Sequence, residues 1–96
     1  MLKERLNQDQ YLAIEERENG TLYRGFTGHN ESLINHYLSY GNFKEMPEYA
    51  DGGFRRVYID SENKTTFTYC EGDIYFKVCN NWNKELEEMK RFYSEY

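Results

Sequence analysis

The chain has 96 residues, 39% of them hydrophobic and 30% charged, and its 17 acidic and 12 basic residues give a formal net charge of −5. This is the length of one average domain, so we expect a single domain over residues 1–96 with one hydrophobic core. The hydrophobic fraction excludes intrinsic disorder, and the negative charge disfavours generic binding to nucleic acid or to anionic membranes.

The N-terminal residues 1–10 are mostly polar or charged, and nowhere do 18 apolar residues follow one another. Neither a secretory signal nor a membrane-spanning helix is predicted, so we expect a cytoplasmic protein without a membrane partner. Cys70 and Cys79 are then expected to be reduced thiols.

Residues 11–26 contain Asn19-Gly20 between two stretches of β-favouring residues. Because Asn-Gly tolerates the positive φ angles of a type I′ turn, this pattern predicts a β-hairpin. The alternative is a helix from Leu2 to about Glu18, since this stretch is rich in helix formers and Gly20 could end it. The pattern favours the hairpin and leaves open whether residues 3–18 are helix or hairpin.

Residues 30–40 predict a helix, because their apolar residues share one helical face: Leu33, Ile34, Tyr37 and Leu38. Asn30 is suited to cap the N-terminus of this helix, and Gly41 lies just past its end. Residues 42–53 hold Pro47 and the cluster Asp51-Gly52-Gly53, which predicts a loop.

Residues 54–80 predict a three-stranded antiparallel meander whose register follows from its two turns. A two-residue turn at Glu71-Gly72 places Phe67 opposite Phe76, and a three-residue loop at residues 61–63 places Val57 opposite Phe67. Since side chains alternate along a strand, one continuous apolar face is predicted. It contains Val57, Ile59, Phe67, Tyr69, Ile74, Phe76 and Val78.

The last segment predicts an amphipathic helix from Trp82 to Tyr96, capped by Asn80 or Asn81. Its apolar stripe steps by three and four residues: Trp82, Leu86, Met89, Tyr93 and Tyr96. We therefore expect an α+β fold of order ββαβββα, with a mostly antiparallel sheet and two amphipathic helices packed on one of its faces.

The second face of the predicted meander is the candidate partner-binding surface. By the register above it displays Phe54, Arg56, Tyr58, Thr66, Thr68, Tyr75 and Lys77. Tyr and Arg are favoured at interface hot spots, so this face predicts a protein partner. Glu71 and Asp73 at the neighbouring turn join the candidates, although flanking acids are ordinary at a tight turn. The alternative is that the Tyr and Thr side chains only stabilise the sheet, or that the N-terminal hairpin covers this face.

The sequence contains no recognisable catalytic, phosphate-binding or metal-binding motif. It holds no nucleophile elbow, no phosphate loop and no Cys or His spacing typical of zinc, so we expect no metal, no cofactor and no catalytic residue. His29 with an acid is the one general acid–base pair we retain, as the basis of an alternative hydrolase or nuclease.

These features favour a non-enzymatic protein-binding modulator that occupies a partner surface, helped by an acidic helix edge of Glu85, Glu87, Glu88 and Glu95. In size, acidity and Tyr content the chain resembles small inhibitors from phages and mobile elements, including anti-CRISPR and anti-restriction proteins. The alternatives are the small enzyme, a homo-oligomeric structural module and, as the lesser candidate, a binder of single-stranded nucleic acid. The identity of the partner does not follow from the sequence.

Overall fold

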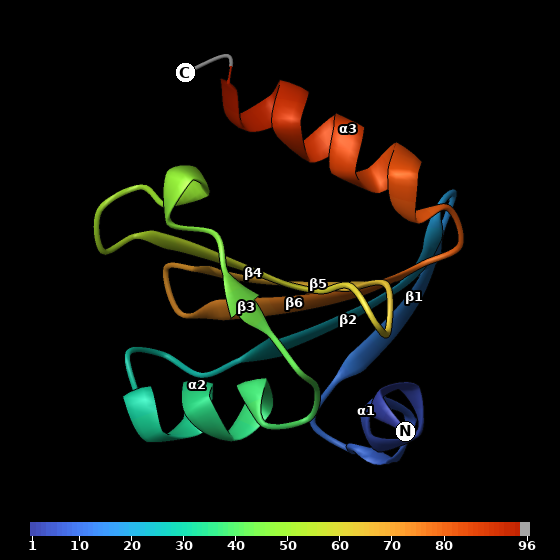
Figure 1. Cartoon of the computed structure of the whole chain (residues 1–96). Coiled ribbons are helices and arrows are strands. Elements are labelled where there is room, and N and C mark those ends of the chain that lie inside the picture. The colour runs from blue at the N-terminus through green and yellow to red at the C-terminus, as the bar shows by residue number, and fades with distance from the viewer. Residues whose placement is uncertain (95–96) are drawn as a thin grey trace.

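The computed structural model describes residues 1–94 as one antiparallel six-stranded sheet with helices on both sides (Figure 1). The helices are α1 (Leu2–Gln8), α2 (Glu31–Leu38), the 3₁₀ turn η1 (Pro47–Tyr49) and α3 (Trp82–Ser94). The strands are β1 (Ala13–Arg17), β2 (Gly20–Phe26), β3 (Lys44–Glu45), β4 (Arg55–Asp60), β5 (Thr65–Cys70) and β6 (Asp73–Cys79). They lie in the order β1-β2-β6-β5-β4-β3, which confirms the expected α+β class.

The N-terminal segment contains both a helix and a hairpin. In α1, Leu2 and Leu6 are one helical turn apart and both are buried, so this short helix is held by the core. The predicted hairpin then forms from β1 and β2, with Arg17 opposite Gly20. Its turn residues are Glu18 and Asn19 instead of Asn19 and Gly20. Gly20 begins β2 with a φ of 138° and lies where a Cβ atom would be 1.9 Å from the Val78 carbonyl oxygen.

Helix α2 confirms the prediction for residues 30–40. The Asn30 side chain accepts the Leu33 N–H at 3.1 Å, which satisfies one of the unpaired donors of the first turn. Within the predicted loop of residues 42–53, β3 and η1 form, and β3 pairs Lys44 with Ile59 of β4.

The register of the meander is confirmed at one turn and wrong at the other. Phe67 lies opposite Phe76, as expected, but Val57 lies opposite Thr68 because the β4–β5 loop has four residues, 61–64. The buried Asp60 orders this loop by accepting the Asn63 N–H at 3.1 Å. One added loop residue moves every β4 side chain to the opposite face. Val57 and Ile59 therefore lie on the face predicted to be polar.

The main core lies between the sheet and the two helices α1 and α2. Its buried side chains are Leu2, Leu6, Leu12, Tyr23, Ile34, Tyr37, Phe67, Tyr69, Ile74 and Phe76. Tyr40 links the C-terminal ends of α1 and α2, because its hydroxyl donates to Asp9 at 2.7 Å. Burial together with this hydrogen bond raises the pKa of Tyr40 to about 12. No helix within residues 1–94 has the length and apolar character needed to cross a bilayer.

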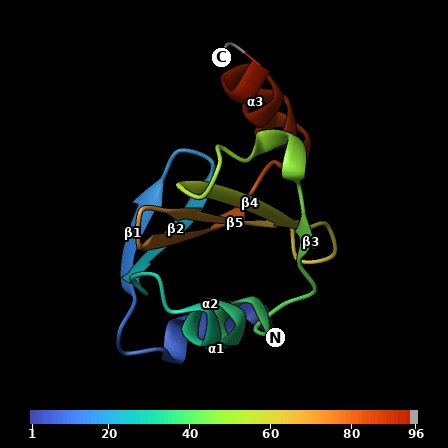
Figure 2. The ribbon, with the colours of Figure 1, turned by 90° about the vertical axis from the view of Figure 1, so that its left-hand side faces the viewer.

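Helix α3 lies on the other side of the sheet from α1 and α2 (Figure 2), which corrects the expectation that the helices share one face. Its Tyr93 ring stacks on Tyr49 at 4.8 Å and lies under the Arg55 guanidinium at 4.7 Å. Successive side chains of a strand point to opposite faces of the sheet. Arg55 therefore lies on the face of α3, and Arg56 lies on the face of α1 and α2. Tyr96, the end of the predicted stripe, lies outside the described residues.

Candidate protein-binding site

The residues predicted to form one binding surface occupy three places. Tyr75, Lys77 and Asp73 alternate along β6 on the face that α3 partly covers. Arg56 and Tyr58 lie opposite Tyr69 and Phe67, on the face of α1 and α2. Phe54 and Glu71 meet at the far end of the meander, where the Phe54 carbonyl accepts the Glu71 N–H at 2.9 Å. The prediction that these residues share one face was wrong, because the β4–β5 loop has one residue more than predicted.

Arg56 and Tyr58 have structural partners in the main core. The Arg56 guanidinium lies 4.9 Å from the Tyr69 ring centroid and forms two hydrogen bonds with Glu31, at 3.1 and 2.6 Å. This hydrogen bonding lowers the pKa of Glu31 and raises that of Arg56. The Tyr58 ring packs edge-on against the buried Phe67 at 5.7 Å. Alanine at either position would disturb the core, so neither is a clean probe of binding.

His29, the histidine of the alternative enzyme, is bound to a tyrosine instead of an acid. Its Nδ1 lies 2.8 Å from the hydroxyl of Tyr69, whose side chain is 1% exposed. A general base needs hydrogen-bond reach to its proton and an orienting partner, and Tyr69 is a weak orienter compared with a carboxylate. Within residues 1–94, no three His, Cys, Asp or Glu side chains are grouped to hold a metal ion.

A groove runs along α3, and its first part lies between this helix and strands β2 and β6. Its first hollow has a volume of about 340 Å³ and is lined by Arg17, Glu18, Asn19, Leu22, Lys77, Lys84 and Glu88. A second hollow of about 230 Å³ is lined by Glu85, Glu88, Met89, Phe92 and Tyr93. Glu88 borders both hollows, so we treat them as one surface and call it the α3 groove.

Aromatic and basic side chains lie beside this groove on the sheet. Tyr75 precedes Lys77 by two residues on β6 and therefore lies on the same face. The Arg24 guanidinium of β2 lies 5.7 Å from the Tyr75 ring centroid. On the helix side the groove ends at Phe92, which is 55% exposed. Arg24 and Phe92 were missed by the sequence reasoning, because the position of Arg24 depends on the pairing of β2 with β6 and that of Phe92 on the crossing of α3 over the sheet.

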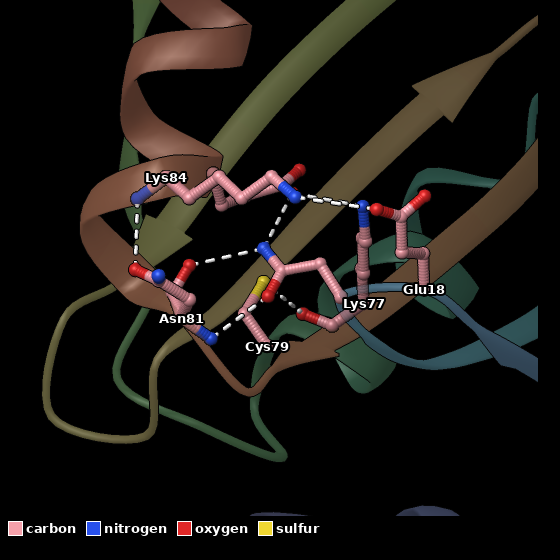
Figure 3. A network of polar contacts seen from close by, with 7 residues as sticks. Glu18, Lys77, Cys79, Asn81 and Lys84 are labelled. Carbon is pink, nitrogen blue, oxygen red and sulfur yellow. Dashed lines mark hydrogen bonds and ion pairs between the residues drawn. The ribbon is translucent and has the colours of Figure 1, made fainter.

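The hairpin turn fixes the N-terminal end of α3 and with it the groove wall (Figure 3). The Asn81 N–H donates to the Asn19 side chain at 2.8 Å, and the Asn19 amide donates to the Asn81 carbonyl at 3.0 Å. Asn81 in turn caps the helix by accepting the Lys84 N–H at 3.1 Å. This confirms Asn81 as the predicted cap.

An ion pair joins the floor of the groove to α3. The Lys77 Nζ lies 2.8 Å from Glu85, whose side chain is largely buried, so Glu85 is not part of the predicted acidic edge. Glu87 and Glu88 are exposed, and Glu95 lies outside the described residues. Burial and the charge of Glu85 raise the pKa of the neighbouring Cys79 thiol to about 12. Cys79 therefore stays protonated at neutral pH and is unsuited to act as a nucleophile.

Comparisons with known proteins give no match: no family model, no curated protein and no solved structure is similar to this chain at a significant level.

Proposed function

We propose that this chain is a non-enzymatic module that binds a protein partner through the α3 groove and modulates that partner by occupying its surface. The observation that carries the proposal is the composition of the groove and its border. Tyr75, Arg24 and Phe92 belong to residue types enriched in protein interfaces. Phe92 lines the second hollow, and Tyr75 and Arg24 lie on the same sheet face as Lys77 and Leu22, which line the first hollow.

The groove suits a protein better than a small molecule. Small-molecule pockets are enclosed and mostly apolar, whereas Arg17, Glu18, Lys84 and Glu88 line this groove and are all exposed. It also suits a protein better than nucleic acid, because Glu18 and Glu88 would face the phosphates. The mixed charges favour a partner with complementary charged groups around an apolar centre.

The resemblance in size and composition to anti-CRISPR and anti-restriction proteins makes a bacterial defence complex the class of target to test first. Such a complex would be inhibited sterically, by occupation of the surface it needs for its own substrate. This mode of action needs no catalytic residue, no cofactor and no metal in the inhibitor.

The test is affinity capture from bacterial lysate with the tagged protein, read by mass spectrometry and followed by a titration with the captured protein. The test variant is Tyr75→Ala/Phe92→Ala, which changes the groove residue Phe92 and Tyr75 on the neighbouring sheet face. We call it the groove variant. The matched control is Phe54→Ala, since Phe54 is 65% exposed but lies outside the groove. We expect the groove variant to weaken binding by at least about 2 kcal/mol and the control to bind as the original protein does.

Equal binding by the groove variant and the control would exclude the α3 groove as the site. Light scattering over a range of concentrations separates this proposal from a homo-oligomeric module, because a monomer at all concentrations excludes self-association. Circular dichroism of each variant checks that the fold is retained.

A further inference from the structure

Strand β1 is the longer open edge of the sheet. All five of its residues, Ala13–Arg17, are exposed, while the opposite edge is formed by the two-residue strand β3. An edge strand leaves half of its backbone donors and acceptors without a partner in the sheet, and such an edge can pair with another chain.

The outward-pointing backbone groups of β1 belong to Ile14 and Glu16. The Thr27 N–H donates to the Gly72 carbonyl at 2.8 Å, which continues the pairing of β2 with β6. Because bonded and non-bonded pairs alternate in an antiparallel ladder, odd-numbered residues of β2 bond to β6 and even-numbered ones bond to β1. The β1 residues opposite those even-numbered positions are Ala13, Glu15 and Arg17. Ile14 and Glu16 therefore direct their N–H and C=O groups away from the sheet.

The side chains at these two positions differ in character and lie on the same face. Ile14 is apolar and 52% exposed. The Glu16 carboxylate accepts the Thr21 hydroxyl at 3.1 Å, and it has no ion-pair partner within residues 1–94. Arg17 in the same hairpin is already paired with Glu15 at 3.2 Å. The edge thus offers one apolar side chain and one unneutralised acid, two residues apart.

A second copy of the chain is a poor match for this edge. Antiparallel pairing of two β1 strands centred on Glu15 or on Glu16 places that carboxylate directly opposite its own copy. Like charges directly opposite each other destabilise a strand pair. Pairing centred on Ile14 places Glu16 opposite Leu12, a buried apolar residue that offers the carboxylate no partner. Acids on an edge strand are a common protection against self-pairing, and here they leave a basic segment of another protein as the complementary occupant.

We propose that β1 docks an extended segment of the protein partner as a seventh strand, with a Lys or Arg beside Glu16 and an apolar side chain two positions away beside Ile14. This inference rests on the proposed function, because it names the part of the partner that binds. The two surfaces adjoin at the β1–β2 turn, since Arg17 and Glu18 line the α3 groove. The Ile14 and Glu16 side chains lie on the other face of the sheet, opposite Tyr23 and Thr21.

The first experiment uses a short capped peptide built of Thr-Lys-Thr-Val repeats. The control peptide has glutamate in place of every lysine. Amide hydrogen exchange of the protein is followed by NMR. At about 90% occupancy by the lysine peptide, the exchange of the Ile14 and Glu16 amides should slow about tenfold, because only the unoccupied fraction exchanges. The glutamate peptide should give no protection. Unchanged exchange at both amides with the lysine peptide overturns the proposal.

The variants Glu16→Pro and Glu16→Ala isolate the backbone contribution. Both remove the carboxylate, but only proline removes the outward N–H, at a position where no bond to β2 is lost. We expect Glu16→Ala to weaken binding of the peptide and Glu16→Pro to abolish it. Equal binding by the two variants overturns strand pairing.

Applied to a captured partner, the same variants separate the two proposals. A partner lost by Tyr75→Ala/Phe92→Ala but retained by Glu16→Pro supports the α3 groove and overturns docking on β1. In the opposite case, Glu16→Pro abolishes peptide binding and the captured partner still binds the groove variant. This outcome supports β1 as the docking strand and overturns the groove as the site.

Discussion

Removal of the Asn19 side chain tests how the groove wall is held. Asn19 is buried, and its amide forms two hydrogen bonds with the backbone of Asn81, at 2.8 and 3.0 Å. A hydrogen bond of this kind contributes about 1 kcal/mol net, so Asn19→Ala should lower the free energy of unfolding by about 2 kcal/mol. For a domain of this size the melting temperature should fall by about 10 °C.

The assay is urea unfolding followed by circular dichroism, with a thermal scan as the second measurement. Asn80→Ala is the matched control. Asn80 is exposed and precedes Asn81, and it bonds to Asn19 through its backbone N–H, which the substitution leaves in place. We expect this control to stay within about 0.5 kcal/mol of the original protein. An Asn19→Ala variant as stable as the control would refute the conclusion that this side chain anchors α3.

Two further predictions concern the sheet and its loop. Gly20→Ala should destabilise the protein by about 3 kcal/mol or more in urea unfolding, because its Cβ would meet the Val78 carbonyl, while Gly53→Ala, in open space, should be nearly neutral. Burial acts to raise the pKa of Asp60, but hydrogen bonds from Asn63 and other neighbours outweigh it and lower that pKa from 3.8. The stabilisation is therefore present above about pH 3.8 and is lost as the pH falls through the lower folded-state pKa. Asp60→Asn should cost about 2 kcal/mol at pH 7, and the difference from the original protein should shrink below pH 3.8; a constant difference would contradict this role.

Local patterns predicted those parts of the fold that depend on neighbouring residues. The Asn30 cap and the apolar face of α2, the Glu71-Gly72 turn and the amphipathic α3 all follow from residues within one or two turns of each other. The β4–β5 loop was mispredicted by one residue, because Asp60 accepts the Asn63 N–H and Lys64 adopts a φ of 51°. Asx turns of this kind have a sequence signal in an Asp before the turn, but the signal does not set the loop length.

The candidate site could be predicted only in part. Tyr75, Lys77 and Asp73 were placed on one face correctly, because the β5–β6 turn set their register. Arg24 and Phe92 come from β2 and α3, which are distant from β6 or cross it, and no local pattern links them. Whether the site binds a partner is the prediction that the capture experiment tests.

By itself the sequence determined the α+β class, the N-terminal caps and amphipathic character of α2 and α3, and the register of one turn, because capping, periodicity and turn chemistry act over short distances. Only the tertiary structure decided that α1 forms, that α3 lies on the opposite face from α2, and that β1 is left as an open edge. Helix α1 is too short to be stable alone and depends on the burial of Leu2 and Leu6. Helix α3 is held at its N-terminal end by the hydrogen bonds between Asn19 and Asn81, two residues that are 62 positions apart and meet only when the sheet has assembled.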